Sequence, residues 1–228
     1  MNDTKALVQL PLLRFVRGRR AWLPILGWSL LGIGSAVVAR RTGSTTGADH
    51  TLRGTFAFVV VPLLAFAVVS AASGGTGLRP GVRGLVALGA APRRAAAASI
   101  AVAMLVSALL CAVVGTVVCL VAHGGGDVSL ARDLPATAVV SFASGATYAA
   151  FFCAGSAIGR GALRGFFLVA DWVLGAPAGL AAVLVPRGHV MALFGGGACF
   201  SLSRTTSSIV LVLLCVVYAA LALRLARR

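Results

Sequence analysis

The sequence predicts an all-α, polytopic helical membrane protein, and three observations lead to that prediction. Hydrophobic residues make up 59% of the chain and charged residues 11%, whereas soluble domains carry about 25% charged residues. The mean hydropathy is +1.00, and a soluble fold could not hide that much apolar surface. The apolar runs are also continuous, without the alternation of a membrane barrel, so helices are the only spanning structure open to them.

We expect a single transmembrane domain over residues 1–228, with six transmembrane helices. Each apolar run has about 20 residues, enough to cross roughly 30 Å of hydrocarbon at about 1.5 Å per residue. The fifth run contains "GAPAG" (Gly175–Gly179), in which a proline between two glycines predicts a kink. The six runs are Ala21–Ala39, Gly54–Ser73, Ala95–Ala122, Pro135–Ile158, Gly165–Val185 and Ser207–Leu223.

An amphipathic helix in the membrane interface is expected over residues 1–20, ahead of the first span. The segment "KALVQLPLLRFVRGRR" combines arginines that can reach lipid phosphates with four apolar residues, Leu7, Leu10, Leu13 and Phe15. A cleaved signal peptide is the alternative, but "GSAVVARR" offers no clean A-x-A cleavage site. We therefore expect the first span to be retained.

The distribution of charge sets the expected orientation. Most of the 20 Lys and Arg residues lie on the side of the N-terminus, which the positive-inside rule makes cytoplasmic. Asp49, Asp127 and Asp133 fall on the opposite side. We expect a multi-pass protein of the bacterial inner (cytoplasmic) membrane with both termini in the cytoplasm. Aromatic residues do not interleave with the arginines, so the net charge of +15 does not indicate a nucleic-acid partner.

The last extracytoplasmic connection, residues 186–206, contains "MALFGGGACF", which is too apolar for an ordinary loop. We expect it to dip into the membrane as a re-entrant segment, which is tolerated where protein or a wet cavity covers its backbone. Three histidines, His50, His123 and His189, fall on the same side. Their loops are separate and lack the spacing of metal ligands, so we expect solvated positions and no metal site.

Residues 74–94 form the longest cytoplasmic loop and carry a helix pattern of their own. Within "GLRPGVRGLVALGAAPRR", Pro80 can open a helix, Gly89 can end it, and Pro92 prevents its continuation. Apolar residues recur between them near helical spacing, at Val82, Leu85, Val86 and Leu88. A loop that only sets topology needs charge but no start, apolar side and stop. We therefore favour a helix that docks a soluble partner.

These features together resemble the permease subunit of an ABC transporter, of the type-2 exporter class. The wording "LRPGVRGLVALGAAPRRAAAAS" (Leu78–Ser99) is similar to that family's loop, in which a basic stretch precedes a turn into the third span. As architecture, the resemblance covers nearly the whole chain. It implies a coupling helix seated in a cleft of the ATPase subunit, with candidate contacts at Arg79, Arg83, Leu85, Leu88 and Arg93. Many relatives carry a glutamate in this loop, whereas this chain has none.

The chain carries no nucleotide-binding motif, and we expect no enzyme activity of its own. Its only lysine is Lys5 and it has no glutamate, which excludes a phosphate-binding loop and HExxH zinc-hydrolase chemistry. By resemblance, ATP and Mg²⁺ would bind a separate ATPase subunit. The permease would work as two copies, identical or homologous, in contact with membrane lipids. The alternative function is a non-transporting membrane anchor or assembly subunit that recruits a soluble partner through the same loop.

Asp171 is the only acidic residue within a predicted span, where an ionised group must pair, face water or serve a function. Arg164 lies seven residues earlier, on nearly the same face of the helix. We expect an ion pair of Asp171 with Arg164 or Arg160 that fixes the helix near the interface. A role of Asp171 in substrate or proton binding is the alternative.

Overall fold

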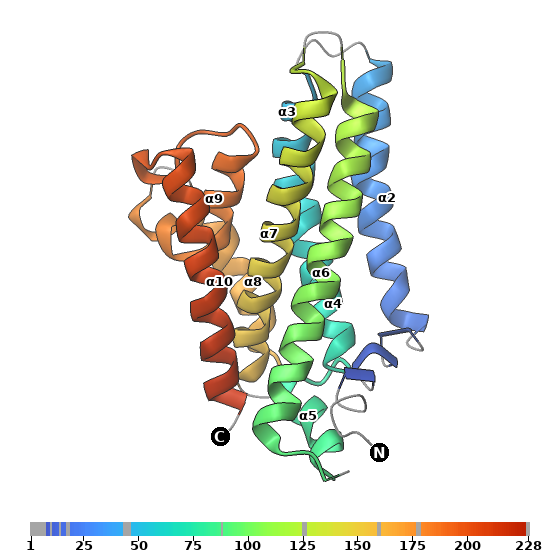
Figure 1. The fold of residues 1–228 in the computed structure, drawn as a ribbon, viewed down its shortest axis with the longest axis vertical. Coiled ribbons are helices and arrows are strands. Elements are labelled where there is room, and N and C mark those ends of the chain that lie inside the picture. The colour runs from blue at the N-terminus through green and yellow to red at the C-terminus, as the bar shows by residue number, and fades with distance from the viewer. Residues whose placement is uncertain are drawn as a thin grey trace.

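The computed structural model describes residues 8–9, 11–13, 15–16, 19–42, 47–87, 89–124, 127–158, 161–176 and 179–226. The regular structure in those ranges is entirely helical (Figure 1), which confirms the predicted all-α class. The elements are α2 (Arg19–Arg41), α3 (Gly47–Thr51), η1 (Leu52–Val60), α4 (Val61–Ala72), α5 (Leu78–Ala87), α6 (Pro92–Ala122), α7 (Leu130–Ala157), α8 (Leu163–Leu174), η2 (Leu180–Leu184), α9 (Pro186–Leu193), η3 (Cys199–Ser201) and α10 (Arg204–Ala226).

Five helical stretches among the described residues are long and apolar enough to cross a membrane, and the protein is a multi-pass membrane protein. They are Trp22–Arg41, Ala48–Ala72, Pro92–Ala122, Leu130–Ala157 and Arg204–Ala226. The second of them joins α3, η1 and α4, and η1 has π-helix hydrogen bonding over nine residues. Pro62, which has no N–H to donate, lies in the first turn of α4 directly after it.

The fifth predicted span, Gly165–Val185, does not form as one continuous helix. The helix α8 has 12 residues, or about 18 Å at 1.5 Å per residue, roughly half of the hydrocarbon thickness. It ends at Gly175, whose N–H bonds to the Asp171 carbonyl at 2.9 Å. A Cβ at Gly175 would lie 2.6 Å from the Cβ of Arg187, so the chain turns where only glycine fits. The predicted kink is thus a complete break.

The bundle is organised around α7, which packs against α6, α10 and α4. Small residues let α6 and α7 approach closely. A Cβ at Gly145 would lie 2.6 Å from the Ser107 carbonyl oxygen, and one at Gly115 would lie 2.3 Å from Ser141 Oγ. A larger residue at Gly145 would therefore meet backbone and separate the two helices, whereas one at Gly115 would displace the side chains of Ser141 and Phe56.

The segment 186–206, expected to be re-entrant, contains α9 and η3 and leads into α10. The helix α9 packs against α7, η1 and α10, and Figure 1 shows it beside the half of α10 that is far from the C-terminus. Its residues Pro186 to Val190 are buried. Protein therefore covers this broken backbone on one side, while its depth in a membrane stays a prediction.

The N-terminal segment is described only in part. Residues 8–9, 11–13 and 15–16 are helical, whereas Leu7 and Leu10 lie outside the described residues. Phe15 is buried against Trp22, with ring centroids 4.9 Å apart, while Leu13 is 42% exposed. An interfacial amphipathic helix over residues 1–20 stays a prediction. Both ends of the chain and α5 lie at the same end of the bundle in Figure 1.

Candidate functional site

The helix α5 lies against the end of the bundle with its apolar side turned inward. Leu78, Gly81, Val82 and Leu85 are buried, and the helix packs on α6 and α7. Gly89 adopts a φ of 88°, a conformation that favours glycine, and it ends this segment. Pro92 then begins α6. Glycine and proline therefore separate two helices at the predicted places.

The outward side of this segment is basic. Arg83 is exposed on α5, and Arg93 and Arg94 are exposed in the first turn of α6. We call these three residues the basic end face. No acidic residue occurs anywhere in residues 74–94. Arginines in the first turn of a helix oppose its dipole, so this arrangement does not stabilise α6 by itself.

Two of the predicted docking residues, Leu85 and Arg79, contact the bundle itself. Leu85 is 2% exposed and belongs to the core of the bundle, so it faces inward in this structure, and its contact with a partner stays a prediction. Arg79 is half-buried, and its Nε donates to the carbonyl oxygen of Leu225 at 3.0 Å near the end of α10. Leu88 lies outside the described residues. The apolar pattern of the loop therefore marks its attachment to the bundle, not its outer surface.

The start of α5 is joined to the start of α8. Gly77 and Gly161 both have positive φ, 108° and 85°, and a Cβ at Gly161 would lie 2.9 Å from the Gly77 Cα. Beside this contact, the Arg164 guanidinium donates to Ser73 Oγ at 3.2 Å and lies 4.9 Å from the Phe66 ring centroid. The turn before α8 therefore touches the start of α5 at Gly77 and the end of α4 at Ser73.

At its other end, α8 places Asp171 in a buried polar network. Tyr148 of α7 donates its hydroxyl to Asp171 Oδ2 at 2.9 Å. The Arg187 backbone N–H in the first turn of α9 donates to Asp171 Oδ1 at 3.1 Å, so this carboxylate caps α9. The Arg187 guanidinium lies 3.9 Å from Asp171 Oδ2 and 3.6 Å from the centre of the Phe58 ring of η1. Three elements, α7, α8 and α9, therefore meet at one carboxylate, and η1 joins them through Arg187.

The predicted pair of Asp171 with Arg164 is corrected by this geometry. Among the described residues the ion-pair partner of Asp171 is Arg187, while Arg164 is occupied by Ser73; Arg160 lies outside the described residues. Sequence reasoning missed Arg187 because it was assigned to an outer loop. The sequence did contain a signal for this fold. The segment 186–206 is apolar and follows the glycine–proline pattern of Gly175–Gly179, which could let the chain reverse and pack against the bundle.

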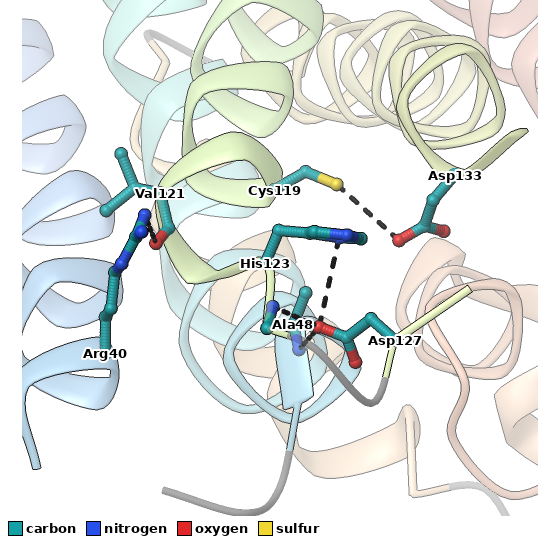
Figure 2. A network of polar contacts seen from close by, with 8 residues as sticks. Arg40, Ala48, Cys119, Val121, His123, Asp127 and Asp133 are labelled. Carbon is teal, nitrogen blue, oxygen red and sulfur yellow. Dashed lines mark hydrogen bonds and ion pairs between the residues drawn. The ribbon is translucent and has the colours of Figure 1, made fainter. Parts of the chain in front are cut away.

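A second polar network ties the extremities of the helices together at the end opposite α5, and Figure 2 shows it at close range. Asp127 Oδ2 accepts the backbone N–H groups of Ala48 at 3.1 Å and Gly124 at 2.9 Å. The same oxygen lies 3.9 Å from His123 Nδ1. Asp127 therefore holds the start of α3 against the loop between α6 and α7.

Two further contacts in Figure 2 strengthen that end. Cys119 Sγ donates to Asp133 Oδ2 at 3.7 Å, and Arg40 donates to the Val121 carbonyl oxygen at 3.4 Å. The three aspartates predicted on one side of the membrane line one cavity of about 330 Å³, together with Arg204. Asp49, Asp127 and Asp133 thus lie at the same end of the bundle, while the side of the membrane that this end faces stays a prediction.

The histidines differ from one another. His50 is exposed and His123 partly exposed, whereas His189 is fully buried in α9 with Nε2 3.1 Å from the Val183 carbonyl oxygen. The expectation that His189 is solvated is therefore wrong, because α9 is folded against the bundle. The described residues contain no group of three or more His, Cys, Asp or Glu side chains placed to hold a metal ion.

The arrangement of the described residues suits two tasks, which are the binding of a partner and the coupling of movements between helices. The basic end face can bind an acidic surface, and the contacts of α8 connect that face to the Asp171 network. Comparisons of the chain with protein-family models, with curated proteins and with solved structures give no match.

Proposed function

We propose that the chain is the membrane-spanning permease subunit of an ATP-driven ABC exporter, which forms the translocation path and couples to a separate ATPase subunit. The observation that carries the proposal is the position of α5. The apolar side of α5 is buried in the bundle, while Arg83 of α5 and the neighbouring Arg93 and Arg94 of α6 are exposed. A loop that only sets topology needs basic residues but gains nothing from a helix packed rigidly against the bundle.

The contacts of α5 suit a coupling role. Arg79 connects it to the end of α10, and Gly77 connects it to Gly161 ahead of α8. When two ATPase subunits bind ATP and close, they would displace α5. These contacts would then move α8 and α10 with it as a rigid body. Because α6 and α7 are too closely packed to part for a substrate, we place the path between two permease copies, identical or homologous.

The proposed topology follows from the same position. Both chain ends and α5 lie at one end of the bundle (Figure 1), and this end would face the cytoplasm, where an ATPase is found. Six crossings would then be completed by α8 with the segment up to α10, as a broken and partly re-entrant passage. The membrane would be the inner membrane of a bacterium.

The test is purification of the chain from its native membrane in mild detergent, followed by measurement of bound ATPase. We expect a stoichiometric partner that carries a phosphate-binding loop and hydrolyses ATP. Arg83→Glu reverses one charge of the basic end face, and we expect it to reduce the amount of bound ATPase at least about fivefold, since rim charges act on the order of 1 kcal/mol. Arg132→Glu makes the same change on an exposed arginine at the opposite end and serves as control.

The outcomes separate the two candidate functions. Loss of the ATPase in Arg83→Glu but not in Arg132→Glu supports the permease. A soluble partner without ATPase activity, lost in the same variant, would instead support the membrane anchor or assembly subunit. Equal recovery of the ATPase in both variants would show that the basic end face is not the docking site.

A further inference from the structure

A groove of about 560 Å³ lies between α2 and the α3–η1 stretch, on the half of the bundle far from α5. One wall is the apolar outer side of α2 and the other is the first turns of the second span. Both walls belong to stretches that are long and apolar enough to cross a membrane. The lining residues are Leu30, Leu31, Gly34, Ser35, Val38, Ala39, His50, Thr51, Gly54 and Thr55.

Two facing glycines keep the groove open. A Cβ added to Gly34 of α2 or to Gly54 of η1 would meet no atom within 4 Å. Two residues earlier on α2, Gly32 marks the line of contact, because a Cβ there would lie 3.4 Å from Val60. The two helices therefore touch along one line and leave space beside it.

The groove is mostly apolar, His50 lines one end of it, and Arg41 lies on α2 just beyond the lining residues. Arg41 lies seven residues after Gly34, nearly two turns further on the same face of α2. It is exposed, as is His50 across the groove. Neither side chain has a hydrogen bond or ion pair with any residue that the structure describes. Arg40, by contrast, is engaged with Val121.

The dimensions suit one leaflet of a bilayer. From Leu30 to Ala39 the helix rises about 14 Å, close to half of a hydrocarbon core of roughly 30 Å. An aliphatic chain could lie along Leu30, Leu31 and Val38, and a negative group at its upper end would meet Arg41. The charge of that end complements a phosphate, since basic residues next to a span attract anionic headgroups.

We propose that this groove is a phospholipid site, in which one acyl chain of a lipid from the adjacent leaflet fills the groove and the lipid phosphate binds Arg41 and His50. A second copy of the chain is the other possible occupant. A symmetric contact would place each basic end near its equivalent in the copy, where like charges repel. The lipid therefore fits the charge of the site better.

The test counts phospholipid molecules that remain bound to the full chain. Wild type is reconstituted in nanodiscs of phosphatidylglycerol and phosphatidylcholine, extracted into mild detergent and analysed by native mass spectrometry. We expect about one tightly bound phospholipid per chain, with phosphatidylglycerol preferred. Gly54→Leu places a side chain in the groove and should reduce that occupancy at least about tenfold. Gly27→Leu, also on α2 with open space around its Cβ, should leave it unchanged.

A second variant tests the headgroup. Arg41→Gln keeps a polar, though shorter, side chain and removes its charge, and it should reduce the preference for phosphatidylglycerol about fivefold. Equal phospholipid occupancy in wild type and Gly54→Leu would overturn the proposal. So would a change of Gly54→Leu from dimer to monomer with lipid occupancy retained, because it would assign the groove to a second copy. These readouts use no ATPase, so they stand apart from the test of the transport function.

Discussion

The two ends of the bundle differ in their acidic residues, although both carry exposed arginines. At the end with α5, Arg83, Arg93 and Arg94 are exposed, and no acidic residue lies in residues 74–94. Toward the other end, Asp127 and Asp171 accept hydrogen bonds from backbone groups of their own chain. Unpaired charge at a surface is available to a partner, whereas carboxylates engaged by backbone groups hold segments in place. The first end is therefore suited to docking and the second to holding its connecting segments closed.

The largest effect is expected at the Asp171 network. Asp171→Ala leaves the buried guanidinium of Arg187 without its counter-ion and removes the cap of α9, so we expect the unfolding free energy to fall by about 3–5 kcal/mol. Thermal unfolding in detergent measures this loss. The double variant Asp171→Asn/Arg187→Met, which removes both charges, should recover most of the stability. A double variant as unstable as Asp171→Ala would show that the charge pair is not the cause.

A smaller effect is expected at Leu85, and its nature distinguishes core from docking surface. Leu85→Ala should lower the unfolding free energy by about 2–4 kcal/mol, because it removes buried methyl groups. Once folded, the variant should bind its partner as wild type does, whereas Arg83→Glu should weaken binding without a loss of stability. Reduced binding in folded Leu85→Ala, with its Tm unchanged, would place this residue on the docking surface after all.

The smallest effect on stability is expected at the contact between α5 and α8. Gly161→Ala forces a side chain into a left-handed conformation against Gly77, which costs about 1–2 kcal/mol. In the complex with the ATPase we expect ATPase binding to persist and substrate transport per ATP hydrolysed to fall. Gly165→Ala is the control, because Gly165 lies in the first turn of α8, four residues after Gly161, and a Cβ there meets no atom within 4 Å. Equal transport in the two variants would remove α8 from the coupling route.

The sequence predicted the helical membrane class and the place of α5 because both depend on local information. Apolar runs define the spans, and Gly89 and Pro92 end one helix and begin the next whatever the surrounding tertiary structure. It could not tell which way the apolar side of α5 turns, because the pattern of Val82 and Leu85 is the same whether they pack on a partner or on the bundle. The bundle proved to be their partner.

The partner of Asp171 was beyond sequence reasoning for a related physical reason. Arg187 lies 16 residues away, and the distance closes only because the chain breaks at Gly175 and returns. The sequence signalled a disturbance at "GAPAG" but not whether it bends a helix or ends it. That difference depends on the close approach of the Arg187 side chain to Gly175, which is a tertiary contact.

The shortness of α8 also has a consequence for how the protein is made. Its 12 residues include Arg164 in the first turn and Asp171 further along. A charge at the centre of a nascent segment disfavours insertion by about 2.5–3.5 kcal/mol on the translocon scale, whereas an arginine near a helix end can reach the interface. Such a segment is not released into lipid on its own hydrophobicity. It needs Ser73 and Tyr148 of helices synthesised earlier and Arg187 of the segment synthesised after it. We therefore expect stable insertion of α8 only after α9 has been synthesised, because Arg187 of α9 is the ion-pair partner of Asp171.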